Sequence, residues 1–194
     1  YSSFKREWVL EHNELLDAFN EMTPPVDEKN RYRELAEYGN TIYQSIRAGN
    51  PNGIWVMQGW MFGHNKEFWS PQSIQAFLSK VPAAGMIIQD IGNDRYGVWE
   101  SAQAFYGKPW IYGYIHNYGG SNPVYGDFRS YNEQVPSLLL NKEKENLVGF
   151  GAFPEGLNNN SVVYEYIFDL AWSNRKDSLE DWLAVYTQAR YGKT

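Results

Sequence analysis

The sequence predicts an α/β fold in which a parallel β-sheet is covered by helices. Short apolar segments alternate along the chain with longer segments whose apolar residues recur at helical spacing. The apolar segments show no strict alternation of apolar and polar residues, which is typical of parallel strands buried on both faces. Strands that alternate with helices in this way are expected to pair in parallel, with the helices as crossover connections.

Five segments are the expected strands, and polar or aromatic side chains follow most of them. The strands are residues 16–20, 54–61, 85–91, 110–117 and 147–153. No glycine-rich phosphate loop follows any strand, which argues against the nucleotide-binding type of doubly wound sheet. A barrel would gather the polar strand ends at one mouth, but eight strands close a barrel and we count five. On the strand pattern alone, both topologies stay open.

The helical segments between these strands have clear start signals. The first helix is expected to follow two prolines, with Asp27 as its N-cap. The second starts at Ser70, a capping residue that precedes a proline at the first helical position. The last starts near Ser178, whose spacing to Asp181 resembles a capping box. Between them, further helices are expected at residues 97–105, 132–142 and 161–172.

Composition and charge favour a carbohydrate-binding protein and exclude several other classes. Aromatic residues make up 17% of the 194 residues, and such rings stack on the apolar faces of sugars, although a tryptophan-rich core is the alternative. A net charge of −6 without a basic patch argues against nucleic-acid and anionic-membrane partners. The chain has no cysteine, which excludes disulfides and thiol catalysis. No apolar run approaches the ~18 residues of a membrane span.

No metal or other cofactor is expected. The histidines are scattered without the spacing of a metal site, and no HExxH motif is present. Asp90, Asn93 and Asp94 could together ligate calcium, but a polar loop is the favoured interpretation of this segment. No serine lies in a GxSxG elbow, so a serine hydrolase is not supported either.

Two carboxylates stand directly after expected strands. Glu155 follows an apolar run and is held between Pro154, which is rigid, and Gly156, which is permissive. Glu21 follows another short apolar run and is preceded by Asn20, whose amide could hold a sugar hydroxyl. Hydrolysis of a glycosidic bond requires two carboxyl groups, one as acid and the other as nucleophile or base. The pair therefore predicts a glycoside hydrolase.

Some of these residues also have structural interpretations. Glu155 could cap the helix that begins near Ser161, or it could pair with Arg190. His116 and Asn117 could bind substrate at the end of a strand. Alternatively, Asn117 and the glycines that follow it could form a turn that requires positive φ angles.

Four motifs in this order and spacing resemble the α-N-acetylglucosaminidases of glycoside hydrolase family 89. They are FNEMTPP at residues 19–25, WVMQGWMF at 55–62, HNYGG at 116–120 and AFPEG at 152–156. The resemblance extends from about residue 17 to residue 192. It implies a (β/α)8 TIM-type barrel followed by a helical domain. We therefore expect about five β/α units of a partial barrel in residues 1–175 and the start of the helical domain in residues 176–194.

The resemblance also implies an activity and roles for individual residues. The activity is exo-acting, retaining removal of terminal α-linked N-acetylglucosamine from glycans or glycosaminoglycans. By motif, Glu21 corresponds to the general acid/base and Glu155 to the nucleophile, while Asn20 and Trp60 line the sugar site. Four further residues are expected to bind substrate because they lie at the ends of expected strands: Asp90, His116, Asn117 and Tyr118.

The stereochemistry of the substrate gives both carboxylates a task. In an α-linked N-acetylglucosaminide the acetamido group lies on the same side of the ring as the leaving group, so it cannot attack from behind. The protein must then supply the nucleophile itself. We expect the carboxyl groups of Glu21 and Glu155 to face each other across one cleft, about 5–5.5 Å apart as in retaining enzymes.

Two other functions stay open: a non-catalytic carbohydrate-binding barrel remnant, and a retaining glycosidase with a different sugar preference. Five strands leave open sheet edges, so we expect the chain to need the remainder of its own polypeptide or a second copy of itself. The expected ligand is a carbohydrate with terminal α-N-acetylglucosamine. For location, a secreted or periplasmic bacterial protein is favoured over a lysosomal one.

Overall fold

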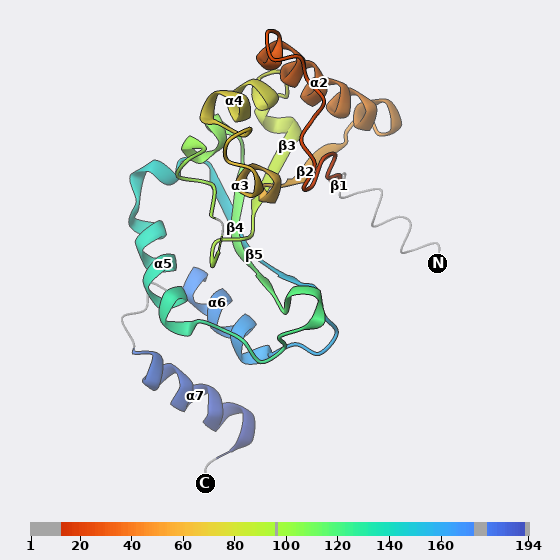
Figure 1. Ribbon diagram of the computed structural model, residues 1–194. Coiled ribbons are helices and arrows are strands. Elements are labelled where there is room, and N and C mark those ends of the chain that lie inside the picture. Colours follow the sequence, from red (N-terminus) through yellow and green to blue (C-terminus); the bar gives the residue numbers. More distant parts are fainter. Residues whose placement is uncertain (1–12, 96, 173–177, 193–194) are drawn as a thin grey trace. The chain divides into compact units, whose positions relative to one another are not determined.

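The computed structural model describes residues 13–95, 97–172 and 178–192 (Figure 1). Its strands form a single sheet in the order β1-β2-β3-β4-β5, which is also their order along the chain. The first three neighbouring pairs, β1–β2, β2–β3 and β3–β4, are parallel. The strands are β1 Asn13–Leu15, β2 Ile54–Gln58, β3 Met86–Asp90, β4 Trp110–His116 and β5 Leu147–Pro154.

The last strand continues the same direction. At the start of β4, the Trp110 N–H donates to the Asn146 carbonyl, which directly precedes β5, at 3.1 Å. At the end of β4, the His116 carbonyl accepts from the N–H of Glu155, directly after β5, also at 3.1 Å. The start of β4 therefore pairs with the start of β5, and the end of β4 pairs with the end of β5. The two strands are parallel. A parallel sheet whose spatial order follows the chain is the arrangement of a (β/α) barrel wall.

The helices alternate with the strands as expected from the sequence. They are α2 Arg31–Gly49, α3 Trp60–His64, α4 Pro71–Ser79, α5 Phe128–Leu140, α6 Ser161–Trp172 and α7 Leu179–Tyr191. None of these helices, in the part of the chain that the structure describes, has the length and apolar character needed to cross a membrane. The chain forms two compact units, each described by itself. The first unit contains residues 1–114 and 143–153, and the second contains residues 115–142 and 154–194.

Aromatic rings form much of the core of the first unit. Trp55 of β2 is fully buried and meets Phe77 of α4 edge to face, with ring centroids 5.9 Å apart. Trp110 of β4 is also fully buried and stacks on Trp99 at 5.6 Å, with the ring planes 14° apart. These tryptophans fill the space between sheet and helices, which is the alternative that the composition left open.

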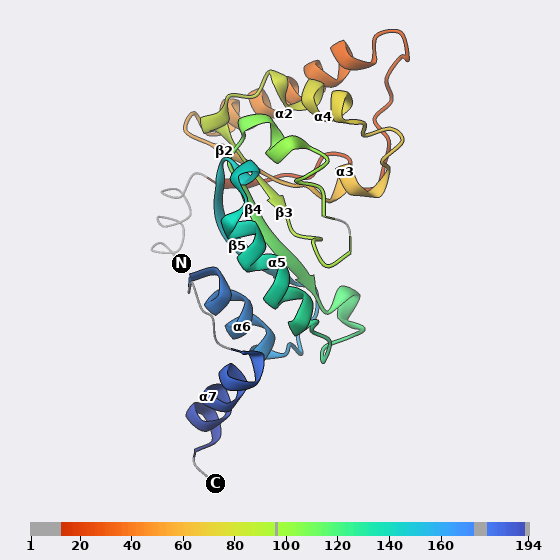
Figure 2. The same cartoon turned by 90° about the vertical axis from the view of Figure 1, so that its left-hand side faces the viewer.

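Helix α2 lies beside α4 (Figure 2), and their close packing depends on a glycine. A methyl group on Gly39 of α2 would lie 2.0 Å from the carbonyl oxygen of Phe77 in α4. No side chain can occupy that position without moving one helix away from the other. Leu35 of α2 is fully buried in the same core.

Tyr166 of α6 connects the helices of the second unit. It is buried, and its hydroxyl donates to the side-chain oxygen of Asn132 in α5 at 2.7 Å. Its ring meets Trp182 of α7 edge to face, with centroids 4.8 Å apart. One side chain thus contacts both neighbouring helices.

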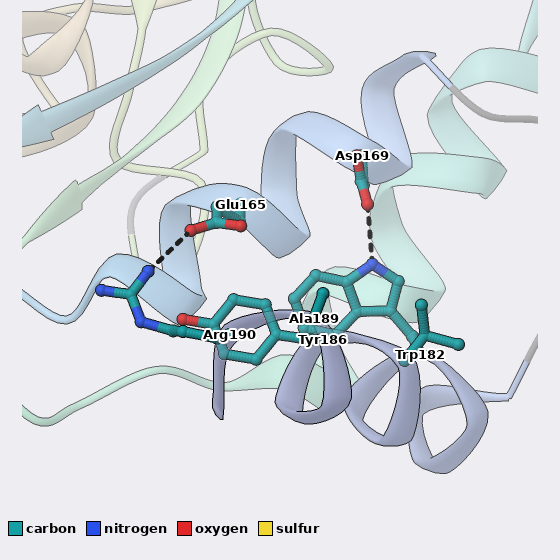
Figure 3. Close-up of a pocket in the computed structure, with 7 residues that line it drawn as sticks. Glu165, Asp169, Trp182, Tyr186, Ala189 and Arg190 are labelled. Atoms are coloured by element: carbon teal, nitrogen blue, oxygen red, sulfur yellow. Dashed lines mark hydrogen bonds and ion pairs between the residues drawn. The ribbon is translucent and has the colours of Figure 1, made fainter. Parts of the chain in front are cut away.

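A hollow of about 340 Å³ lies between α6 and α7 (Figure 3). Trp182 donates its indole N–H to Asp169 at 2.8 Å and stacks on Tyr186, with centroids 5.1 Å apart. The guanidinium of Arg190 lies 5.9 Å from the centre of the Tyr186 ring and pairs with Glu165 at 3.4 Å. These contacts hold α7 against α6. The aromatic rings that line this hollow therefore serve helix packing.

Two boundaries differ from the sequence-based prediction near the amino-terminal motifs. The predicted strand at 16–20 is wrong, because pairing with β2 ends at Leu16 and residues 18–22 form a turn in which Asn20 has a φ of 45°. The predicted strand 54–61 ends early, because Gly59 turns the chain and Trp60 opens the short helix α3.

The predicted helix at 97–105 is also wrong. This region forms turns followed by a short 3-10 helix, Gln103–Gly107, in which residues 103–106 have φ values between 46° and 58°. A left-handed backbone of this kind cannot continue a right-handed α-helix. The helix predicted at 132–142 exists, but it begins at Phe128, where Asp127 caps it by accepting from the Ser130 N–H at 3.1 Å.

The capping predictions have mixed outcomes. Ser70 accepts from the Ser73 N–H at 3.2 Å and Ser178 accepts from the Asp181 N–H at 3.1 Å, so both caps are confirmed. Asp27 is not the cap of α2, which begins at Arg31. Its carboxylate instead accepts from the N–H of the residue two positions later and closes a turn before the helix.

We predict that Gly39→Ala destabilises the protein by about 1–3 kcal/mol, because the added methyl group overpacks the α2–α4 contact. The matched control is Gly49→Ala at the end of the same helix, where a methyl group would meet nothing within 4 Å. This control should be neutral or stabilising by up to about 1 kcal/mol, since alanine is the better helix former. Urea unfolding of both variants measures the difference. Equal midpoints would show that α2 and α4 do not pack this closely.

Candidate active site

Glu155 presents an exposed carboxylate directly after β5, and two backbone groups hold it. Its Oε2 atom accepts a hydrogen bond from the Gly119 N–H at 2.7 Å. Its own N–H donates to the His116 carbonyl at 3.1 Å, which continues the ladder between β4 and β5 by one residue. A charge-assisted bond to a backbone donor fixes the orientation of a carboxylate better than a bond to a mobile side chain. Within the described residues of the second unit, Oε1 accepts no hydrogen bond.

The loop after β4 is folded so that it aims the Gly119 N–H at Glu155. Asn117 adopts a left-handed conformation with φ 57° and ψ 53°, and Gly119 and Gly120 have φ values of 57° and 75°. Glycine tolerates this conformation without steric cost, and asparagine tolerates it better than most residues. The turn that the sequence offered as an alternative for this segment is therefore confirmed, and it supplies a donor to the carboxylate.

Asn117 ties the two loops together. It is 3% exposed, and its Nδ2 donates to the Asn158 carbonyl at 3.1 Å, while its Oδ1 accepts from the Asn122 N–H at 2.8 Å. Gly156 packs directly on this amide, because a methyl group there would lie 2.1 Å from Asn117 Nδ2. The backbone after Glu155 is therefore held against the loop that supplies its hydrogen-bond donor.

His116 is buried and uses both ring nitrogens within the protein. Its Nε2 lies 2.8 Å from the Tyr125 carbonyl and its Nδ1 lies 2.6 Å from the Tyr164 hydroxyl. A carbonyl only accepts, so Nε2 carries the proton, and in the neutral ring Nδ1 accepts from the tyrosine O–H. His116 thereby links the end of β4 to the following loop and to α6. Tyr118, the next residue but one, is half-buried.

The motif residues of the first unit lie at the ends of β1 and β2. Asn20 and Glu21 are exposed and belong to the turn after β1, where the Asn20 N–H donates to the Asp17 carboxylate at 3.2 Å. Trp60 is half-buried and opens α3 directly after Gly59.

Asp90, at the end of β3, is 1% exposed. Its Oδ2 accepts from the N–H groups of Val98 and Trp99 at 3.1 and 2.9 Å. Burial raises the pKa of this carboxyl to about 7, even though the two N–H groups act in the opposite direction. These contacts give Asp90 a structural role in closing the loop after β3, and its part in substrate binding stays a prediction.

The structure brings four of the predicted site residues together in the second unit: His116, Asn117, Tyr118 and Glu155. The others, Asn20, Glu21, Trp60 and Asp90, belong to the first unit. The separation of the Glu21 and Glu155 carboxyl groups stays a prediction. No group of three or more histidine, aspartate or glutamate side chains that could hold a metal ion occurs among the described residues.

Both structural alternatives for Glu155 are wrong. The ion pair of Arg190 is with Glu165, and the Glu155 carboxylate accepts from Gly119 instead of capping α6. Sequence reasoning missed Gly119 as a donor and Tyr164 as the partner of His116. The glycine pair at 119–120 carried the available signal, because consecutive glycines favour a turn with positive φ angles.

Comparison with known proteins assigns the family. The sequence model of the alpha-N-acetylglucosaminidase (NAGLU) tim-barrel domain matches residues 1–174. The chain belongs to the α-N-acetylglucosaminidase family. The human alpha-N-acetylglucosaminidase is 32% identical over 190 residues, which cover 96% of this chain and 25% of the human protein.

Solved structures share the fold. The family 89 glycoside hydrolase of Clostridium perfringens, in complex with PUGNAc, aligns with a TM-score of 0.72 and 24% identity over 93% of this chain and 19% of that chain. A doubly Glu-to-Gln-substituted form of the Clostridium perfringens protein, in complex with its substrate GlcNAc-alpha-1,4-galactose, aligns equally well at 23% identity. The prediction of a partial (β/α)8 TIM-type barrel is confirmed, and this chain spans about a quarter of the length of its human relative. The proposed boundary with a helical domain at residue 176 stays a prediction.

We predict that stability falls as pH rises through the pKa of Asp90. Because the native pKa is about 7 and that of an unfolded aspartate is about 3.9, the native state retains a proton that the unfolded state has lost between these values. The free energy of unfolding should therefore decrease from pH 4 to pH 7. Asp90→Asn keeps an acceptor for the loop but cannot ionise, so urea unfolding should show a shallower decrease. Identical slopes in both proteins would contradict the assignment.

We predict that Gly156→Ala lowers kcat/KM by about 10²-fold, the effect expected when a catalytic group moves by about 1 Å. The added methyl group must displace the Asn117 amide, which holds the Glu155 loop. Gly149→Ala is the matched control in β5, because its methyl group would meet Ile111 at an ordinary 3.7 Å. Kinetics on a chromogenic α-N-acetylglucosaminide compare the two, and unchanged kcat/KM in Gly156→Ala would show that the loop tolerates displacement.

Proposed function

We propose that this chain carries the catalytic carboxylates of a retaining, exo-acting glycoside hydrolase. Its substrates are glycans or glycosaminoglycans that end in α-linked N-acetylglucosamine. The observation that carries the proposal is the carboxylate of Glu155, which is exposed after a barrel strand and held by the Gly119 N–H at 2.7 Å. The names of its human relative and of its bacterial structural neighbours support the same sugar and the same class of reaction.

In the first step, Glu155 attacks the anomeric carbon of the terminal sugar. The Gly119 N–H holds Oε2 and leaves Oε1 to form the new bond. Glu21 donates its proton to the glycosidic oxygen as the bond to the leaving group breaks. The products of this step are the free leaving group and a sugar joined to Glu155 through a β-linked ester, with Glu21 as the carboxylate.

In the second step, water releases the sugar. Glu21 now accepts a proton from a water molecule, whose oxygen attacks the anomeric carbon from the α face. The ester bond breaks and Glu155 returns to the carboxylate. Two inversions give α-N-acetylglucosamine, the configuration of the substrate. The acetamido group of an α-linked substrate lies on the leaving-group side, so this route needs a protein carboxylate at position 155.

The remaining site residues divide into two groups in this proposal. Asn20 and Trp60 line the sugar site, and Asp90 and Tyr118 complete the strand-end set. His116 and Asn117 act by positioning, because their polar side-chain atoms are bound to the loops that hold Glu155 and, through Tyr164, to α6.

We predict that Glu155→Ala lowers kcat by about 10⁴-fold, as expected when a nucleophile is removed. Azide should restore part of the turnover of an activated aryl α-N-acetylglucosaminide. It takes the place of the missing carboxylate and attacks from the β face, so the product is the β-azide. In Glu21→Ala the nucleophile is intact, and azide attacks the ester from the α face to give the α-azide. NMR of the products identifies each anomer.

Glu133→Ala, at an exposed carboxylate of α5, is the matched control and should keep wild-type turnover without azide products. An α-azide from Glu155→Ala and a β-azide from Glu21→Ala would reverse the two roles. Initial release of the β-anomer by the wild type would exclude a retaining mechanism. Binding of N-acetylglucosamine without any turnover would support the carbohydrate-binding alternative instead.

A further inference from the structure

The segment that carries Glu21 is anchored at both ends on the helices of the first unit. At its start, the ring of Phe19 meets Tyr38 of α2 edge to face, with centroids 5.5 Å apart, and Phe77 of α4 at 6.3 Å. At its end, the Tyr38 hydroxyl donates to the Pro25 carbonyl at 3.1 Å. Residues 20–23 between these anchors are exposed, Glu21 among them. Helices α2 and α4 therefore hold the ends of the loop, and a separate contact supports its exposed middle.

That contact is a hydrogen bond between two side chains. The amide Nδ2 of Asn65 donates to the Oγ1 atom of Thr23 at 3.2 Å. Thr23 lies two residues after Glu21, and Asn65 directly follows α3 in the connection between β2 and β3. Within the described residues of the first unit, the Glu21 carboxylate itself accepts no hydrogen bond. The place of this carboxylate is therefore set by the backbone of its loop.

Asn65 is itself held in one orientation. Its Oδ1 accepts from the Phe68 N–H at 3.1 Å, and its backbone carbonyl accepts from the Trp69 N–H at 2.9 Å. Both aromatic side chains are buried. The N–H donor fixes which end of the amide is the oxygen, so Nδ2 faces Thr23 and the hydroxyl oxygen is the acceptor. A donor fastened to the core thus reaches the middle of the Glu21 loop.

We propose that Asn65 is a positioning residue for the acid/base: through Thr23 it holds the loop at the place from which Glu21 exchanges protons. The inference rests on the proposed function and adds to it a residue that does not touch the substrate. A general acid or base acts only within hydrogen-bond reach of the atom that takes or gives the proton. A displacement of about 1 Å at a reacting group lowers a rate by about 10²-fold. Asn117 gives the Glu155 loop a similar support, since its amide also comes from the loop of the neighbouring strand.

The test uses the full chain and two substrates that differ only in the leaving group. Methanol is a poor leaving group, so methyl α-N-acetylglucosaminide needs the proton of Glu21. Dinitrophenolate leaves without a proton, so the dinitrophenyl glycoside does not need it. Thr23→Val removes the acceptor at nearly constant shape and should lower kcat/KM for the methyl glycoside by about tenfold, a part of the general-acid contribution of about 10²–10⁴-fold. The value of kcat/KM for the dinitrophenyl glycoside should stay within about twofold of wild type, because its leaving group needs no acid.

The second step of the reaction gives a further readout. On the dinitrophenyl glycoside the attack of water limits kcat, so kcat reports on Glu21 as the base. Thr23→Val should lower kcat and KM together on this substrate, by about fivefold each, and azide should restore kcat because an anion attacks without a base. A mere loss of folded protein would lower kcat without lowering KM, and azide would not restore it.

Three variants complete the comparison. Thr23→Ser keeps a hydroxyl oxygen for Asn65 and should behave as the wild type. Thr41→Val removes an exposed hydroxyl from α2 and should change the kinetics on neither glycoside. Asn65→Ala removes the same hydrogen bond from its other end, so in combination with Thr23→Val it should add little to the loss on the methyl glycoside. It also leaves the Phe68 N–H without its acceptor, so Asn65→Ala should unfold at a lower urea concentration.

Glu21→Ala separates the inference from the proposed function. If this variant loses as much kcat/KM on the dinitrophenyl glycoside as on the methyl glycoside, or if the wild type hydrolyses neither, the proposed role of Glu21 fails and the inference fails with it. If Glu21→Ala shows the selective loss and Thr23→Val does not, the inference alone is overturned. Equal losses of Thr23→Val on both glycosides, without rescue by azide, would also overturn it and show that the Asn65 contact only supports the fold.

Discussion

The hydrogen bond from the Gly119 N–H to the Glu155 carboxylate is the contact on which the arrangement of the candidate site depends. It joins two loops that are 36 residues apart in the sequence and that leave neighbouring parallel strands. The strand pairing brings the loops together, since the Glu155 N–H takes the next position of the ladder on His116. Left-handed residues then turn the first loop back, so that a backbone donor and not a side chain meets the carboxylate. A backbone donor cannot leave by rotating about a side-chain bond, which suits the nucleophilic role proposed for Glu155.

Aromatic residues show how one composition can serve two purposes. The excess of aromatic rings suggested a sugar site, yet Trp55, Trp99 and Trp110 are buried between the sheet and its covering segments. Tyr166 and Trp182 are likewise buried, between helices of the second unit. By contrast, Trp60, the tryptophan that was predicted to line the sugar site, is half-buried beside a strand end. Composition alone could not separate these cases, because burial is decided by the neighbours that the fold provides.

Elements with strong local signals could be predicted from the sequence, and elements set by distant contacts could not. Strands β2 to β5 and the caps at Ser70 and Ser178 were found because apolar runs and capping spacings are local properties. Strand β1 was misplaced, because its three residues pair only where β2 offers partners. Glu155 was singled out from its setting between Pro154 and Gly156, and its catalytic role stays a proposal. Its donor was not, since the reach of the Gly119 N–H depends on backbone angles that follow from the packing of two loops.

A comparison of two carboxylates, Asp90 at the end of β3 and Glu155 after β5, distinguishes a structural acid from a catalytic candidate. Asp90 is buried, and one of its oxygens is shared by two N–H groups of its own loop, so burial favours the protonated form. Glu155 is exposed, with one oxygen held and the other without a hydrogen bond in its unit. A nucleophile needs an accessible oxygen in a fixed position, and only the second arrangement provides one. Several strands of this sheet end in or next to polar residues, so position alone does not identify a reactive acid. The hydrogen-bond donors at each carboxylate do: two N–H groups of its own loop hold Asp90, whereas one N–H group of a neighbouring loop holds Glu155 and leaves its other oxygen accessible.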